Sequence, residues 1–140
     1  MTSPVRTALL LAATLALTAC GSPRRDDCRT LGALLNNGAD RIDKARATPL
    51  DPHGLKSLAD ILEQTATEAD ALKLQSEDLQ KLSKDYASLL REVARNARDM
   101  ATAGEAGDAD KAKAESETME KLIAAEPKLI AEVNKLCSAE

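Results

Sequence analysis

The sequence predicts an all-α protein, and three observations support this prediction. The chain of 140 residues is 44% hydrophobic and 30% charged, and Leu and Ala far outnumber the β-branched residues that strands favour. Apolar residues recur every three or four positions, which is the period of a helix buried along one side. Segments rich in Gly and Pro interrupt this period at a few places, so they divide the chain into long helices.

The N-terminal segment 1–19 has the pattern of a signal peptide. Arg6 supplies a positive charge, and an apolar run follows from Ala8 to Ala19. This run is shorter than the roughly 20 residues that a membrane-spanning helix needs. It fits the hydrophobic region of a secretory signal.

The end of this segment, Leu17, Thr18, Ala19 and Cys20, resembles the lipobox of bacterial lipoproteins. The resemblance covers only the signal. It implies that the Cys20 thiol is acylated, that the chain is cut directly before it, and that the mature protein is held on a membrane of the cell envelope. By analogy with lipoprotein sorting, Gly21 at the second mature position favours the outer membrane. An ordinary cleaved signal with an incidental Cys is the alternative.

Cys28 and Cys137 remain when Cys20 is assigned to the lipid. Exported chains fold in an oxidising compartment, so this pair predicts a disulfide between the two ends of the mature chain. Two free thiols that bind a metal or form a redox pair are the alternative, but the chain has no C-x-x-C motif.

Residues 20–27 are expected to form a lipidated tether before a helical domain over 28–140. Arg24 and Arg25 could touch anionic lipid head groups. Asp26 and Asp27 cancel much of that positive charge, which favours a solvated tether.

Small or apolar residues at 28, 31, 35, 38, 42 and 45 predict the first helix. Gly38 lies in this stripe and indicates either a locally weak helix or a very close contact. Pro49 ends the helix, and Asp51 and Pro52 are the expected N-cap and first residue of the second helix.

The second helix is predicted over 55–72 and the third over 79–100, with Ser76 as the N-cap of the third. The sole aromatic residue, Tyr86, is expected in the core with its hydroxyl at the surface. A Gly-rich turn at 103–108 then precedes the last helical stripe, over 116–137.

Pro127 falls inside the last stripe, where it either kinks one helix or separates two. Paired apolar residues at 122/123, 129/130 and 136/137 make this the widest apolar face. They either fill the core or leave a groove for another helix.

Four stripes with short connections predict an antiparallel up-down four-helix bundle. In that topology the first helix begins at the end of the bundle where the fourth finishes. A disulfide between Cys28 and Cys137 would therefore close the bundle by joining its terminal helices.

No pattern of catalytic or metal-binding residues is present in the sequence. His53 is the only histidine, and its position in a Pro-Gly loop is typical of an exposed turn residue rather than a member of a Ser-His-Asp triad. The H-E-x-x-H and C-x-x-C-H motifs are absent. We therefore expect no enzyme activity, no metal site and no cofactor. A net charge of −4 and a single aromatic residue disfavour nucleic-acid binding.

Arg91, Arg95 and Arg98 form a basic line on the third helix. They either contact an acidic partner or form salt bridges within the protein. The expected function is that of a membrane-anchored envelope lipoprotein that acts as a binding, adaptor or structural module, with an envelope protein as partner. The alternative is a periplasmic carrier that holds haem, a metal or a lipid between its helices.

Overall fold

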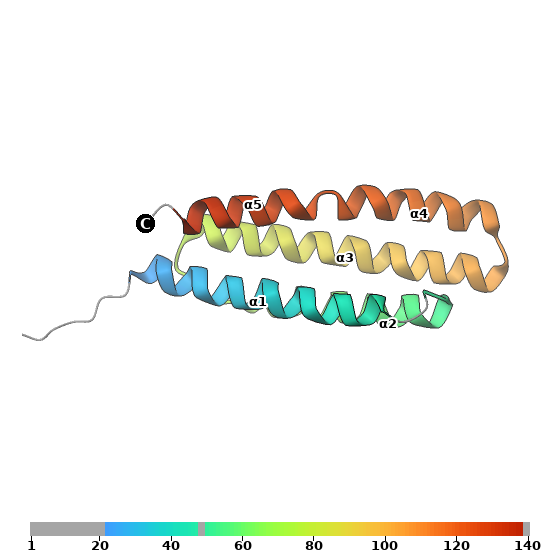
Figure 1. Ribbon diagram of the computed structural model, residues 1–140, viewed down its shortest axis with the longest axis horizontal. Coiled ribbons are helices and arrows are strands. Elements are labelled where there is room, and N and C mark those ends of the chain that lie inside the picture. The colour runs from blue at the N-terminus through green and yellow to red at the C-terminus, as the bar shows by residue number, and fades with distance from the viewer. Residues whose placement is uncertain (1–21, 48–49, 139–140) are drawn as a thin grey trace, which may run out of the picture.

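The computed structural model describes residues 22–47 and 50–138, which form an elongated helical bundle (Figure 1). Its helices are α1 (Pro23–Arg46), α2 (Pro52–Asp70), α3 (Glu77–Ala106), α4 (Ala109–Ile123) and α5 (Glu126–Cys137). The described residues include no strand. The prediction of an all-α protein is confirmed.

Polar residues cap the helices where each loop ends and the helical pattern of apolar residues begins. Asp51 accepts a hydrogen bond from the Gly54 N–H at 2.8 Å, and Asp108 accepts one from the Lys111 N–H at 3.0 Å. Pro52 occupies the first turn of α2, as predicted, where a missing N–H costs nothing. Gly107 ends α3 with φ of 68°, a left-handed conformation that Gly adopts without strain.

The first helix begins at Pro23 rather than at Cys28, so residues 23–27 are helical and not part of a tether. Ser22 is the N-cap, and its side chain accepts a hydrogen bond from the Arg25 N–H. Pro in the first turn and an acidic residue, Asp26, complete a helix start. The polar residues of 22–27 suggested a solvated tether, but Ser, Pro and Asp are also the residues that begin a capped helix.

Pro127 separates two helices instead of kinking one. α4 ends at Ile123, and α5 begins at Glu126, with Pro127 in its first turn. Proline has no N–H to donate to the carbonyl of Ile123, and its ring would clash with that carbonyl. The two helices nevertheless follow one line along α3 (Figure 1).

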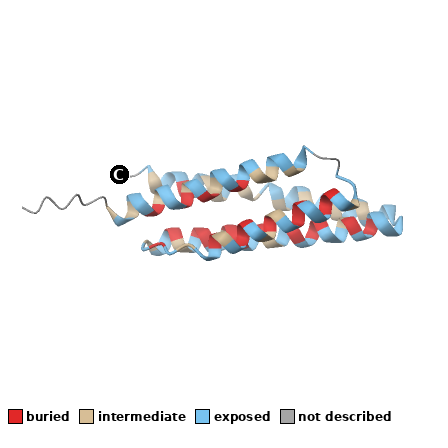
Figure 2. Ribbon diagram, turned by 90° about the horizontal axis from the view of Figure 1, so that it is seen from below, coloured by how far each residue is buried: buried red, intermediate tan, exposed pale blue. Residues whose placement is uncertain are grey.

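The core is built from Leu and Ala, and most of it lies between α2 and α3. These two helices form the most extensive contact, α3 packs on α4 and α5, and α1 packs mainly on α2. Figure 2 shows the buried positions along each helix. On α2 and α3 the buried apolar residues are Leu55, Leu58, Ala59, Leu62, Ala66, Ala69, Leu79, Leu82, Tyr86, Ala87, Leu90, Val93, Ala94, Ala97, Ala101 and Ala103.

Burial is uneven along the outer helices. The buried residues of α1 end at Gly38, although the helix continues to Arg46, and α4 has none. α1 contacts α5 but has no comparable contact with α4. The bundle is therefore well packed at the end where α1 starts and loosely packed between the far half of α1 and α4.

A disulfide joins Cys28 in the first turns of α1 to Cys137 at the end of α5, with the two Cα atoms 5.7 Å apart. The predicted pairing is confirmed. The start of α1 and the end of α5 lie at the same end of the molecule (Figure 1). None of the described helices has the length and hydrophobicity to span a bilayer.

Candidate functional site

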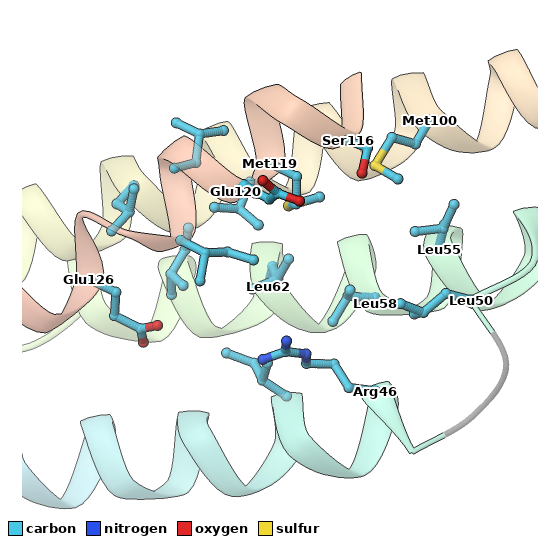
Figure 3. A pocket seen from close by; sticks show the side chains of 16 residues that line it. Arg46, Leu50, Leu55, Leu58, Leu62, Met100, Ser116, Met119, Glu120 and Glu126 are labelled. Atoms are coloured by element: carbon cyan, nitrogen blue, oxygen red, sulfur yellow. The ribbon is translucent and has the colours of Figure 1, made fainter. Parts of the chain in front are cut away.

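The loosely packed part of the bundle contains an apolar cleft of about 380 Å³ between α1 and α2 on one side and α4 on the other (Figure 3). α2 contributes Leu55, Leu58 and Leu62 to its wall. Protein sites for small molecules have volumes of about 300–1,000 Å³ and mostly apolar walls. The cleft is at the lower end of that range.

The rest of the wall is mostly aliphatic, and Ser116 on α4 adds a hydroxyl group to it. α3 provides Leu89, Leu90, Val93 and Met100, and α4 provides Met119, Leu122 and Ile123. The two methionines are unbranched and flexible, so this wall can adapt its shape to a guest. No aromatic side chain lines the cleft.

Two large apolar side chains lie at the cleft and remain in water. Leu50 is 52% exposed and Ile123 is 38% exposed, and these are the exposed large hydrophobic residues of the described chain. Single exposed apolar residues are common on protein surfaces. Here both line the same opening, so a guest in the cleft would remove both from water.

Three charged residues surround the opening: Arg46 in the last turn of α1, Glu120 on α4, and Glu126 in the first turn of α5. Figure 3 shows Arg46 and Glu126 projecting into the space between α1 and the α4–α5 segment. Neither side chain forms a hydrogen bond or an ion pair within 4.0 Å with another described residue. Both are available to a ligand.

The pKa of Glu126 reflects this position. Burial raises it above its ordinary value; nearby Arg46 lowers it in part, and Asp43 raises it. A half-buried carboxylate beside an apolar volume is poorly solvated, and a cation or a hydrogen-bond donor would relieve that cost.

The wide apolar face of the last stripe has two roles. Leu122 and Ile123 line the cleft, which corresponds to the groove alternative. Leu122 also packs against the core, as do Leu129 and Leu136, which corresponds to core filling. The two roles therefore overlap at Leu122. α5 contacts α1, whereas α4 makes no comparable contact with it.

The basic line on α3 is largely paired within the protein. Arg91 lies 2.6 Å from Asp70, and Arg98 lies 3.0 Å from Asp60. Both also approach Glu63. Exposed pairs of this kind contribute about 0–1 kcal/mol each. Arg95 forms no ion pair with another described residue, and none of the three lines the cleft.

Cys20 and Gly21 lie outside the described residues. His53 is exposed in the first turn of α2 and does not line the cleft. Within residues 22–47 and 50–138, no three His, Cys, Asp or Glu side chains are grouped so that they could hold a metal ion. Comparisons with protein-family models, with curated proteins and with solved structures give no match.

Sequence reasoning offered a groove at the doubled apolar face as one of two alternatives, but it missed the charged and loop residues that line the cleft. Arg46, Glu120 and Glu126 look like ordinary surface charges, and Leu50 falls in a loop. The one available signal was the doubled apolar face at 122/123, which exceeds what a single packing seam needs.

Proposed function

We propose that the protein is a membrane-anchored binding module of the bacterial cell envelope, attached through acylated Cys20, and that the apolar cleft is its binding site. The observation that carries the proposal is the cleft itself, which is lined by both exposed large apolar side chains and by three charged ones that form no ion pair with another described residue. The role is one of binding, without a chemical step.

The lipobox resemblance supports the anchor, and the start of α1 makes the attachment short. Cys20 lies three positions before Pro23, so the connection spans at most about 10 Å. With Cys20 acylated, the disulfide end of the bundle would lie near the membrane. Gly21 keeps the outer membrane as the favoured destination.

We also propose an up-and-down antiparallel path in which α4 and α5 together form the fourth rod of the bundle. Two observations support this path. Successive helices pack on each other through short connections, and the disulfide joins the first helix to the last.

An adaptor would use the cleft to hold an apolar helix of an envelope protein, whereas a carrier would use it to hold a small apolar molecule. The volume of about 380 Å³ and the aliphatic wall support the carrier. The Arg91 and Arg98 ion pairs give the adaptor little support, because those arginines already have partners on α2.

The anchor is tested by metabolic labelling with an alkyne fatty acid in a bacterial host that expresses the full chain. We expect Cys20→Ala to abolish the label, because the thiol that accepts the lipid is gone. Cys28→Ala is the matched control and should keep the label. Labelling that persists in Cys20→Ala would overturn the anchor proposal.

The binding site is tested by photocrosslinking in intact envelopes. A diazirine-bearing aliphatic amino acid replaces Met119, which lines the cleft, or Thr118, which is exposed on the same helix and does not. We expect a discrete adduct of one lipid or one protein at position 119 and none at position 118. Equal yields at the two positions, or no adduct at position 119, would contradict the proposed site.

A further inference from the structure

We propose that the cleft holds one acyl chain of a phospholipid with a zwitterionic phosphate–amine head group. The phosphate lies at Arg46, and the amine lies at Glu126 and Glu120. This inference rests on the proposed function and names the ligand of the same site.

The wall of the cleft matches a flexible aliphatic chain. It consists mainly of Leu, Ile, Val and Met side chains, with Ser116 as an uncharged polar residue among them, and the chain's one aromatic residue, Tyr86, does not line it. Planar cofactors usually lie against aromatic walls, whereas an acyl chain needs only apolar surface of adaptable shape. Each methylene that leaves water for such a site contributes about 0.8 kcal/mol.

The opening matches the part of a lipid where the chain meets the head group. Leu50 and Ile123 are the exposed apolar residues there, and they can cover the first methylenes. Arg46, Glu120 and Glu126 line the same cleft (Figure 3). An amphiphile would therefore find both apolar surface for its chain and charged groups for its head.

The charges at the opening have both signs. Among the described residues that line the cleft, Arg46 is the one cation, and Glu120 and Glu126 are the two carboxylates. A guanidinium binds phosphate oxygens through paired N–H donors. A fatty acid or an anionic phospholipid would satisfy Arg46 but would place a negative charge beside two carboxylates. A zwitterionic head brings an ammonium group that pairs with those carboxylates.

The position of the cleft fits a carrier better than a membrane contact. Ile42, at the cleft, follows Pro23 by nineteen helical residues, which places it about 30 Å along α1 from the start of that helix. With the disulfide end at the membrane, a lipid held in the cleft has left the bilayer.

The photocrosslinking experiment identifies the ligand when the adduct at position 119 is analysed by mass spectrometry. We expect a phosphate–amine phospholipid. In the same background, Arg46→Gln should lower the adduct yield about tenfold, because a charge-assisted hydrogen bond to phosphate is lost. Arg46→Lys keeps the charge but loses the paired donors, so it should give an intermediate yield, and Glu126→Gln should lower the yield severalfold.

Two matched controls separate these effects from general changes in charge. Lys44→Gln removes a cation from the same last turn of α1, and Glu117→Gln removes an exposed carboxylate from α4. Neither residue lines the cleft, so both variants should match the parent.

Three results would overturn the lipid inference while leaving the cleft as the binding site. These are a fatty acid or an anionic phospholipid in the adduct, a protein adduct, or equal yields in Arg46→Gln and Lys44→Gln. Absence of any adduct specific to position 119 would instead overturn the proposed function.

Discussion

Asp27 joins two helices that are distant in sequence. It is 5% exposed, and its Oδ2 atom accepts hydrogen bonds from the backbone N–H groups of Gln75 at 2.8 Å and Ser76 at 2.7 Å. Ser76 is the N-cap of α3, as predicted, but its side chain forms no capping bond. A carboxylate from α1 therefore supplies the acceptor at the start of α3.

The pKa of Asp27 follows from these contacts. Burial raises it, but the N–H groups of Ser76 and Gln75 outweigh burial and hold it below its ordinary value of 3.8. A carboxyl group whose pKa is lower in the folded state stabilises the fold above its unfolded pKa. That contribution is lost as the pH falls through the folded pKa.

We expect Asp27→Ala to lower the free energy of unfolding by about 2 kcal/mol, because two backbone donors lose a charged acceptor. Asp26→Ala is the control, since Asp26 is exposed and its carboxylate has a single ion pair with a described residue, with Arg29 at 3.7 Å. Urea unfolding at pH 7 measures the difference. The gap between Asp27→Ala and the parent should narrow below pH 3.8; a gap that widens on acidification would contradict this account.

At the scale of helices, Gly38 sets how closely α1 approaches α2 and α3. A Cβ atom at this position would lie 2.9 Å from the Thr65 methyl carbon and 3.4 Å from the Tyr86 hydroxyl oxygen. Of the two explanations offered by the sequence, close packing is correct. Tyr86 is 2% exposed, so its hydroxyl does not reach the surface as expected, and burial raises its pKa to about 12.

We expect Gly38→Ala to destabilise the protein by about 1–2 kcal/mol, because overpacking outweighs the gain in helix propensity. The Thr65 methyl cannot move aside easily, since the residue is fully buried and its hydroxyl donates to the Ile61 carbonyl at 2.8 Å. Thermal unfolding followed by circular dichroism measures the change.

Two further variants test the cause. Gly32→Ala, on the same helix with nothing near its added Cβ, should stabilise by about 0.5–1 kcal/mol. Thr65→Ser deletes the opposing methyl group, so it should be less destabilising in the Gly38→Ala background than in the parent. Equal costs in both backgrounds would show that the clash is not the cause.

At the scale of the molecule, the disulfide and the cleft lie in different parts of one open bundle. The bridge joins α1 to α5, which are separated by 109 positions at the two cysteines. Beyond the α4–α5 break, α4 packs on α3 and leaves the far half of α1 uncovered. The disulfide thus holds the outer helices together at one end, while the other end remains open enough for a guest.

We expect the double variant Cys28→Ser, Cys137→Ser to lose up to about 4–5 kcal/mol of unfolding free energy, the value that chain entropy gives for a loop of this length. Denaturant unfolding measures the loss. Reduction of the parent protein should give the same value as the double variant. Equal stability of the oxidised parent and the double variant would contradict a stabilising bridge.

The helical class follows from the local spacing of apolar residues, and the disulfide pairing follows from the number of cysteines. A Leu/Ala period of three to four residues requires neighbouring helices to cover it, whatever their exact arrangement. Once Cys20 is assigned to the lipid, two cysteines remain, and they leave one possible pair. The caps at Asp51 and Asp108 are also local, because each side chain reaches a backbone N–H three residues away.

The start of α1, the burial of Asp27 and the cleft depend on contacts between residues distant in sequence. Asp27 looks like a solvated charge until α3 begins beside it. Leu122 and Leu129 are equivalent in the sequence pattern and both pack against the core, yet of the two only Leu122 lines the cleft.

The sequence alone determined that this chain forms amphipathic helices, where most of them stop, and which cysteines pair. Only the tertiary structure decided which apolar faces are covered. The free energy gained by burying an apolar stripe depends on the apolar area that is buried and not on which apolar surface covers it. The period of the stripe therefore cannot specify the spacing between α1 and α4. That spacing is set by close contacts such as Gly38 on Thr65, by the break before Pro127, and by the bridge at one end.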